Sequence, residues 1–252
     1  MTKIIFDNVF KSFDSGLRVL NNLSVRIEEG ESHIILGQSG CGKSVFLKCL
    51  LGIMPIDSGD ITVDGISVRD ENCYQEYLRK FSILFQGNAL FDSMTIKENV
   101  IFGANRRNKD RKLCNKIAEE KLLAVGLEER VFDLYPAEIS GGMQKRAALA
   151  RAIAVEPEIL LFDEPTSGLD PITGGVICNL LKDTIKSLDV TTITITHDLR
   201  VAEFLADRVS LLNKGNIVWT GCISDMQKSG NEFAENFYHA SNVISLNKKA
   251  KI

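Results

Sequence analysis

The sequence predicts an α/β protein that combines an α/β core with an antiparallel β subdomain and an inserted block of helices. Short apolar runs typical of buried strands recur between helical patterns along the chain. Two strand-like runs and a tight-turn signal in the first third predict the antiparallel sheet, and residues 87–155 contain no convincing strand. We therefore expect a core divided into residues 1–86 and 156–222, a helical subdomain at 87–155 and a tail at 223–252.

The antiparallel sheet is expected from three local patterns. Residues 4–10 and 23–27 have the apolar content and alternation of strands, and a turn carrying one aromatic side chain separates them at residues 11–16. Further on, Asp64-Gly65 lies between two short apolar runs, which is a strong signal for a tight hairpin. These segments predict a small antiparallel sheet beside the core.

The core strands and helices follow from apolar runs and from helix-end signals. Strands are expected at 34–36, 81–85, 159–163, 191–196 and 209–212. A helix that starts near Lys43 should stop at Gly52, a typical position for a glycine just past a helix end. Asp170 as the N-cap and Pro171 at the first position open another helix. The apolar stripe of that helix consists of Ile177, Leu181, Ile185 and Leu188.

The middle of the chain predicts three helices, and the tail predicts a fourth. Residues 95–98, Thr-Ile-Lys-Glu, have the form of a capping box. A helix over about 110–125 should stop at Gly126, and an alanine-rich helix should cover 141–154. The expected apolar side of the 110–125 helix consists of Leu113, Ile117 and Val125. In the tail, a short helix would pack through Phe233, Phe237 and Tyr238.

Composition excludes several classes of function. The 252 residues have a formal net charge of −3, which argues against a nucleic-acid partner because such proteins usually carry a basic surface. The longest apolar run, 49–56, is far shorter than the roughly 20 residues that span a bilayer. We expect no signal peptide, because the first ten residues include an acid and no sustained apolar region. Six cysteines without paired spacing favour a reducing compartment over a disulfide framework or a zinc site.

One segment carries the strongest functional signal, because residues 37–44 match the phosphate-loop pattern G-x-x-x-x-G-K-[ST] at every fixed position. They are Gly37, Gln38, Ser39, Gly40, Cys41, Gly42, Lys43 and Ser44. Glycines allow backbone N–H groups to surround a polyphosphate, Lys43 can reach its β- and γ-phosphates, and the Ser44 hydroxyl can bind Mg²⁺. The alternative is a plain glycine-rich turn between a strand and a helix. The strand–loop–helix context favours a nucleoside triphosphate site.

Two acids follow the apolar strand at 159–163. A buried strand ends in carboxylates only where something compensates their desolvation. Asp163 beside Mg²⁺ would satisfy this condition, and Glu164, one residue further on, could polarise an attacking water as a general base. The alternative is that the two acids cap a helix or pair with surface lysines.

Two polar residues follow other strands. His197 comes after the strand at 191–196, at an end where α/β proteins bind ligands, and could hydrogen-bond the γ-phosphate and the catalytic water. Gln86 comes after the strand at 81–85 and could reach Mg²⁺ or water. A satisfied core histidine is the alternative for His197, and Gln86 taken alone is the weaker signal.

A second anion-binding helix end is predicted at Ser140, Gly141, Gly142 and Met143. The serine is a good N-cap and the glycines leave the backbone N–H groups accessible. A capped helix with a loose start is the simpler interpretation. Because the chain already has a phosphate loop, the functional interpretation is contact with the nucleotide held by a second copy.

Taken in order, these segments resemble the motif series of the ATP-binding cassette of ABC transporters. The series is GQSGCGKS, Gln86, ISGGMQ, LLFDE, SGLD and His197, and the similarity covers roughly residues 3–222. The resemblance implies the ABC ATPase fold, which has a P-loop NTPase (RecA-like) core, and ATP hydrolysis with Mg²⁺. It implies that Phe13 stacks on adenine, that residues 167–170 couple two sites, and that Ser140–Met143 act on the ATP of a partner copy.

A narrower resemblance concerns the transported substrate. Met143 replaces the usual glutamine and Ile139 the usual leucine, and the surrounding segments are similar to ATPases of Mla-type phospholipid transporters. That branch implies a periplasmic MCE protein and a STAS-type subunit as partners. The family implies a homodimer formed around ATP, a separate transmembrane permease, and a peripheral location on the cytoplasmic face of the bacterial inner membrane. The expected docking face for the permease lies near Gln86 and the helical block.

Two alternatives remain open from the sequence. One is the ATPase of another importer, for example for amino acids or ions. The other is a soluble cassette ATPase that acts on nucleic acid or ribosomes, which the single cassette, the acidic net charge and the lack of a heptad run disfavour.

Overall fold

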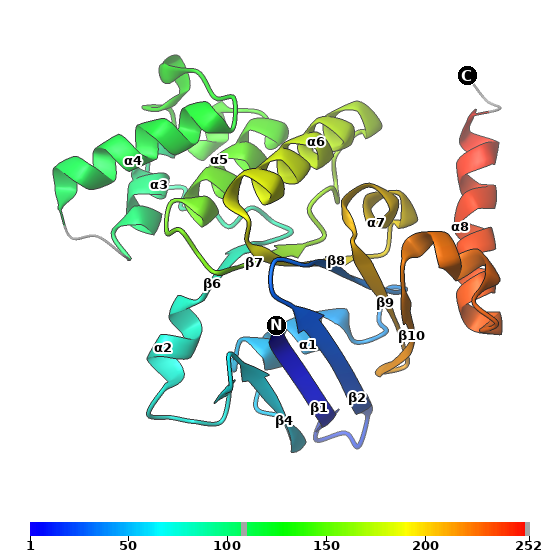
Figure 1. Cartoon of the computed structure of the whole chain (residues 1–252). Coiled ribbons are helices and arrows are strands. Elements are labelled where there is room, and N and C mark those ends of the chain that lie inside the picture. The colour runs from blue at the N-terminus through cyan, green and yellow to red at the C-terminus, as the bar shows by residue number, and fades with distance from the viewer. Residues whose placement is uncertain (107–109, 250–252) are drawn as a thin grey trace. The chain divides into compact units, whose positions relative to one another are not determined.

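The computed structural model describes residues 1–106 and 110–249 (Figure 1). Their contacts separate into two compact units. The first unit contains residues 1–78 together with the chain from Thr191 onward, and the second is Arg79–Val190.

The antiparallel β subdomain lies in the first unit and has four strands. These are β1 (Thr2–Ser12), β2 (Arg18–Glu28), β4 (Ser58–Val63) and β5 (Ile66–Ser67), in the order β2-β1-β4-β5 (Figure 1). The two predicted strands are confirmed, and both are longer than expected. Asp64 and Gly65 have φ angles of 50° and 79°, the left-handed backbone that a two-residue hairpin turn requires. The hairpin prediction is confirmed.

The first unit also contains parallel strands. β3 (Ser32–Leu36) pairs in parallel with β8 (Thr191–Thr196) on one side and with β9 (Arg208–Asn213) on the other. All residues of β3 and β8 are buried, as expected for strands inside a covered sheet. β10 (Asn216–Gly221) adds to β9 as an antiparallel strand.

The helices of the first unit position the loop that follows β3. α1 (Lys43–Leu50) ends at Gly52 as predicted, with a φ of 65° at that glycine. The rings of Phe46 on α1 and Phe6 on β1 are stacked, with centroids 4.3 Å apart. The remaining helical elements are α2 (Tyr74–Arg79), which reaches the boundary of the unit, α7 (Leu199–Leu205), the 3₁₀ helix Ile223–Lys228 and α8 (Glu232–Lys249).

The second unit combines two parallel strands with the helical block. β6 (Phe81–Leu84) pairs with β7 (Ile159–Asp163). The helices are α3 (Ile96–Ala104), α4 (Arg111–Ala124), α5 (Gly141–Ile153) and α6 (Pro171–Leu188), with 3₁₀ turns at Glu129–Val131 and Pro136–Glu138. The capping box at Thr95 and Glu98 is present, and Asp170 caps α6 through the backbone N–H groups of residues 172 and 173. Both end signals are confirmed.

The predicted apolar face of α4 is wrong in part. Leu113 is 42% exposed and Ile117 is only half-buried, whereas Val125 is buried. The buried side chains within the helix are Cys114, Ala118 and Leu122. α3 and α5 pack against α4, whose buried face is formed by Cys114, Ala118 and Leu122, so Leu113 and Ile117 lie on its more exposed side.

Other differences concern elements without a strong local signal. β10, α2 and α7 were not expected, and α8 is longer than a short tail helix. β10 pairs with β9 at the edge of the sheet and is mostly half-exposed, and its apolar run is limited to residues 217–219. On α6, Ile177 and Leu181 are buried as predicted, but the stripe continues through Thr184.

Candidate nucleotide site

The loop between β3 and α1 has the backbone of a phosphate-binding loop. Gly40 and Gly42 have φ angles of 80° and 113°, a backbone conformation that residues with a side chain rarely adopt. A Cβ atom on Gly37 would lie 2.6 Å from the carbonyl oxygen of Leu212, so this position has room only for glycine. Gln38, Ser39 and Gly40 are exposed. The residues between Gly37 and Gly42 therefore form an open loop in front of a helix N-terminus.

Lys43 and Ser44 occupy the first turn of α1. The Lys43 side chain is buried, and its ammonium group donates hydrogen bonds to the carbonyl oxygens of Gly37, at 2.7 Å, and Gln38, at 3.0 Å. These bonds hold the lysine within the loop, beside the positive end of the helix. Ser44 is exposed, and Cys41 is half-buried. The arrangement concentrates positive charge and donors where an anion would bind.

His197 and Phe13 also belong to the first unit. Leu36 and Thr196 are register partners, and the N–H of Gly37 donates to the carbonyl oxygen of Thr196 at 3.2 Å. The phosphate loop and His197 therefore leave their strands at the same edge of the sheet, and His197 is exposed there. Phe13, in the turn between β1 and β2, is 41% exposed, which leaves its ring accessible for stacking.

Glu164 has a strained backbone in the second unit. Its φ is 46°, a region that costs a non-glycine residue about 1–3 kcal/mol and that is concentrated at functional sites. Asp163 ends β7 directly before it, and both carboxylates are half-buried. The carbonyl oxygen of Glu164 accepts a hydrogen bond from the N–H of Ser167 at 3.1 Å, which fixes the turn after the strand.

Gln86 lies at the same sheet edge as these acids. Leu84 of β6 pairs with Phe162 of β7, so the residues that follow the two strands emerge together. The Gln86 side chain is exposed, and its Nε2 donates to Ser167 Oγ at 3.1 Å. The structure therefore brings Gln86, Asp163 and Glu164 to one edge of the second unit.

Ser140 caps α5 as predicted, accepting a hydrogen bond from the N–H of Met143 at 3.3 Å. Ser140 and Gly141 are exposed, and nothing lies within 4 Å of the position of a Cβ atom on Gly141. Gly142 is closer to its surroundings, since a Cβ atom there would be 2.9 Å from Thr173 Cγ2. The start of this 13-residue helix is open to an anion.

Lys145 and Arg151 were missed by sequence reasoning. Lys145 is only 2% exposed, and its ammonium group donates to the carbonyl oxygen of Gln86 at 2.7 Å. Burial lowers the pKa of Lys145, and the nearby Asp163 carboxylate opposes that shift. The available signal was periodicity, because Lys145 lies at helical spacing from the apolar residues 148, 149 and 152 of α5.

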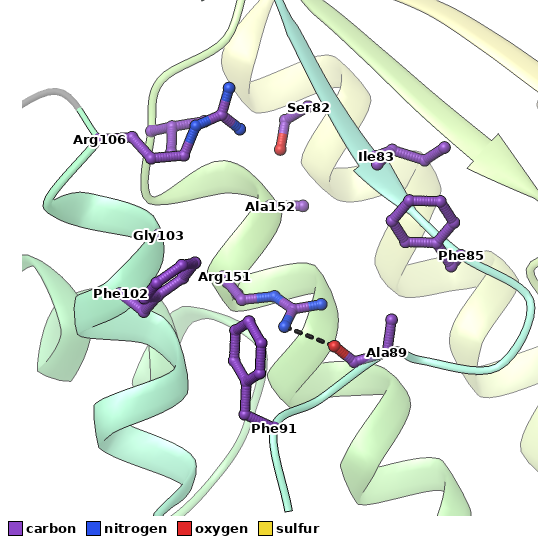
Figure 2. A pocket seen from close by; sticks show the side chains of 11 residues that line it. Ser82, Ile83, Phe85, Ala89, Phe91, Phe102, Gly103, Arg106, Arg151 and Ala152 are labelled. Carbon is purple, nitrogen blue, oxygen red and sulfur yellow. Dashed lines mark hydrogen bonds between the residues drawn. The ribbon is translucent and has the colours of Figure 1, made fainter. Parts of the chain in front are cut away.

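An apolar pocket of about 350 Å³ lies beside this edge in the second unit (Figure 2). The rings of Phe91 and Phe102 meet edge to face, 4.8 Å between centroids, and both are about half-exposed together with Phe85. Two guanidinium groups, of Arg106 and Arg151, also line the pocket. The wall of the pocket is therefore aromatic and also carries the positive charge of two arginines.

A phosphate loop ahead of a helix, with carboxylates after a second parallel strand, defines a P-loop nucleoside triphosphatase. The family model described as ABC transporter matches residues 20–167. The chain belongs to the ABC transporter family and has the ABC ATPase fold, as predicted.

Several transport ATP-binding proteins are similar to most of this chain. GlnQ, a glutamine transport ATP-binding protein of Escherichia coli, is 40% identical over 86% of this chain and 90% of its own length. The probable ribonucleotide transport ATP-binding protein mkl of Mycobacterium tuberculosis is 38% identical over 84% of this chain, which spans 59% of that protein. MetN of Carboxydothermus hydrogenoformans, a methionine import ATP-binding protein, is 37% identical over 83% of this chain and 63% of its length.

Solved structures agree with this assignment. The dimeric post-hydrolysis state of the cassette MJ0796 with ADP and Pi has a TM-score of 0.78 and 33% identity, covering 87% of this chain and 98% of that one. CbiO1 of Clostridium perfringens, part of the transporter complex cbiONQ, has a TM-score of 0.81 and 26% identity, with 100% and 99% covered. The chain is an ATPase of this family that binds ATP, with Mg²⁺ as its metal ion.

The donor atoms fit magnesium. In the part of the chain that the structure describes, no group of three or more His, Cys, Asp or Glu side chains could hold a metal by itself. Mg²⁺ is usually bound by one or two protein oxygens together with substrate phosphates. The hydroxyl of Ser44, the amide oxygen of Gln86 and the carboxylate of Asp163 are oxygen donors of this kind.

Among the described residues, no helix is both long and apolar enough to span a bilayer.

Proposed function

We propose that this chain powers an ABC importer as a homodimer, with two Mg·ATP held between two copies. One observation carries the proposal: the chain presents two exposed anion-binding helix ends, the phosphate loop before α1 and the start of α5 at Ser140 and Gly141. The ATP of one copy occupies the phosphate loop before α1, so the start of α5 is available for the ATP of a partner copy. The dimeric structures of MJ0796 support this arrangement.

The proposed chemistry assigns a role to each residue at the two sheet edges. Lys43 and the loop N–H groups bind the β- and γ-phosphates, and Phe13 stacks on adenine. Ser44, Gln86 and Asp163 would hold Mg²⁺, which would neutralise charge on the phosphates when bound. Glu164 accepts a proton from the attacking water.

His197 is proposed to hydrogen-bond the γ-phosphate and orient that water, and Ser140–Met143 donate to the γ-phosphate held by the other copy. ATP then joins the copies because both surfaces satisfy its charge. Hydrolysis removes that bridge and allows the copies to separate.

The change Ser140→Arg tests the contribution from the partner copy. A long cation at the start of α5 would fill the space for the phosphate, so we expect unchanged ATP affinity but no dimer and at least a tenfold loss of turnover. Light scattering with ATP measures the dimer, and a fluorescent ATP analogue measures affinity. Asp110→Arg, at the exposed N-cap of α4, is the matched control and should dimerise normally. Full hydrolysis by Ser140→Arg would contradict the proposal.

The pocket of Figure 2 is the proposed docking site for a permease segment. Three partly exposed phenylalanines offer apolar contact of the kind that accepts a short amphipathic helix. Arg106 and Arg151 at its wall favour a helix that carries an acidic side chain. A chain that works with such a permease would sit at the cytoplasmic face of the bacterial inner membrane.

For the substrate we propose a phospholipid, delivered with a periplasmic MCE protein and with a STAS-type subunit in the complex. The signature segment with Met143 and Ile139 supports this choice. Amino-acid import is the second candidate, favoured by the similarity to GlnQ and MetN.

Co-purification separates these two substrates. We expect the chain, isolated with its membrane complex in mild detergent, to carry phospholipid detectable by mass spectrometry. Its ATPase rate, after reconstitution, should rise with a phospholipid-loaded partner. A rise with an amino-acid-loaded binding protein instead would establish the second candidate.

A further inference from the structure

The backbone that follows β6 is held by side chains of a single helix. Lys145 of α5 donates to the carbonyl oxygen of Gln86 at 2.7 Å. Arg151, six residues further along the same helix, donates to the carbonyl oxygen of Asn88 at 3.0 Å. It also donates to the carbonyl oxygen of Ala89 at 2.7 Å (Figure 2). Helix α5 therefore fixes three of the four backbone carbonyls between residues 86 and 89.

The segment needs such support because its conformation is unfavourable by itself. Asn88 and Ala89 have φ angles of 60° and 50°, and left-handed backbone at consecutive non-glycine residues persists only where the surroundings impose it. The Nδ2 of Asn88 also donates to Gln144 Oε1 at 3.4 Å, again a side chain of α5. Without these hydrogen bonds, the segment would relax, and Gln86 would keep its side-chain hydrogen bond to Ser167 Oγ but lose the anchor of its backbone.

Burying the Lys145 ammonium group to make one of these hydrogen bonds costs free energy. Its side chain is almost fully buried, and a buried ammonium group is costly unless it is well compensated. An apolar residue of similar length would fill the same space among the alanines of α5 at lower cost. The lysine is therefore better explained by the hydrogen bond it makes than by packing.

We propose that Lys145 is a positioning residue for ATP hydrolysis: its hydrogen bond to the backbone of Gln86 holds that side chain in the geometry required at the nucleotide. This inference rests on the proposed role of Gln86. Because its ammonium group is buried and bonded to that backbone, Lys145 acts on the hydrolysis rate through Gln86.

The same contacts connect the pocket of Figure 2 to the backbone segment that begins at Gln86. Arg151 holds Ala89, and its guanidinium lies 5.8 Å from the ring centroid of Phe91, which also lines the pocket. A helix seated there would press on a segment whose other end carries Gln86. Lys145 is the contact that holds the Gln86 end of this segment.

The test measures steady-state hydrolysis by the full chain with Lys145→Met, which fills the space without a donor. We expect kcat to fall about tenfold, the Mg²⁺ concentration for half-maximal rate to rise, and KM for ATP to stay within twofold, because Lys43 and Phe13 set binding. The melting temperature should change little, because the lost hydrogen bond to Gln86 and the removed cost of a buried charge oppose each other. Lys145→Gln restores a neutral N–H donor and should recover most of kcat.

A double-mutant cycle with Gln86→Ala decides whether the effect passes through Gln86. We expect Lys145→Met to cost no further activity in the Gln86→Ala background. Arg146→Met is the matched control, because Arg146 neighbours Lys145 but donates to the carbonyl oxygen of Gly126; it should leave kcat unchanged. An unchanged kcat in Lys145→Met, an additive loss in the double variant, or no recovery in Lys145→Gln would each overturn the inference.

The cycle also separates this inference from the proposed function. If Gln86→Ala alone had normal activity, the proposed role of Gln86 would fall, and the inference with it. If Gln86→Ala were impaired while Lys145→Met was normal, the inference alone would be wrong.

Discussion

Glu164→Gln is expected to lower ATP turnover by about 10²–10⁴-fold, the usual contribution of a general base. The amide keeps the size and most hydrogen-bonding capacity of the carboxylate but cannot accept the proton of the attacking water. ATP affinity should be unchanged, because Glu164 contributes nothing to the phosphate loop. Turnover is measured by phosphate release. Since hydrolysis is what separates the two copies in our proposal, light scattering should show a stable dimer with ATP.

Glu156→Gln provides a matched control for this change. Glu156 is an exposed glutamate that also has a left-handed φ, of 47°, so the substitution makes the same chemical change in the same backbone region. We expect normal turnover from Glu156→Gln. If Glu164→Gln hydrolysed ATP at the normal rate, Glu164 would not be the general base.

Lys43→Ala should lose at least about tenfold, and up to about a hundredfold, in ATP affinity. One hydrogen bond to a charged group contributes about 1.5–3 kcal/mol, and Lys43 also supplies positive charge beside the phosphates. The carbonyl oxygens of Gly37 and Gln38 would lose their donor, so the loop should also become less ordered. Fluorescence titration with a labelled ATP analogue measures the affinity directly.

Lys48→Ala is the control for the loss of a cation from α1, because Lys48 is an exposed lysine in its last turn. It should bind ATP normally. Equal affinity of Lys43→Ala and the unmodified chain would contradict the phosphate-loop assignment.

Features that depend on neighbouring residues in sequence could be predicted. The glycines of the phosphate loop, the capping box at Thr95 and the N-cap at Asp170 are local, because a few adjacent residues satisfy their own backbone groups. Most of the strands and helices follow from apolar periodicity in the same way, and β10, α2 and α7 are the exceptions. The expected positions of Gln86 and His197 at strand ends needed only the strand boundaries.

Features that depend on distant residues could not be predicted. Lys145 and Gln86 are 59 residues apart, and nothing near either one indicates their contact. The outward position of Leu113 reflects the packing of α3 and α5 on α4, which its own helix does not encode. The left-handed backbone of Glu164 is likewise unusual for its residue type and is imposed by its surroundings.

The stack between Phe6 and Phe46 has a consequence for the affinity of the proposed ATP site. It joins the strand that leads to Phe13 to the helix that begins with Lys43, so the ring proposed to stack on adenine and the loop proposed to bind the phosphates belong to one packed unit. A ligand whose two halves match a fixed spacing gains from the link between them, because placing the second half costs little once the first is bound. Adenosine and inorganic triphosphate offered as separate molecules would each bind weakly to a chain that holds ATP well.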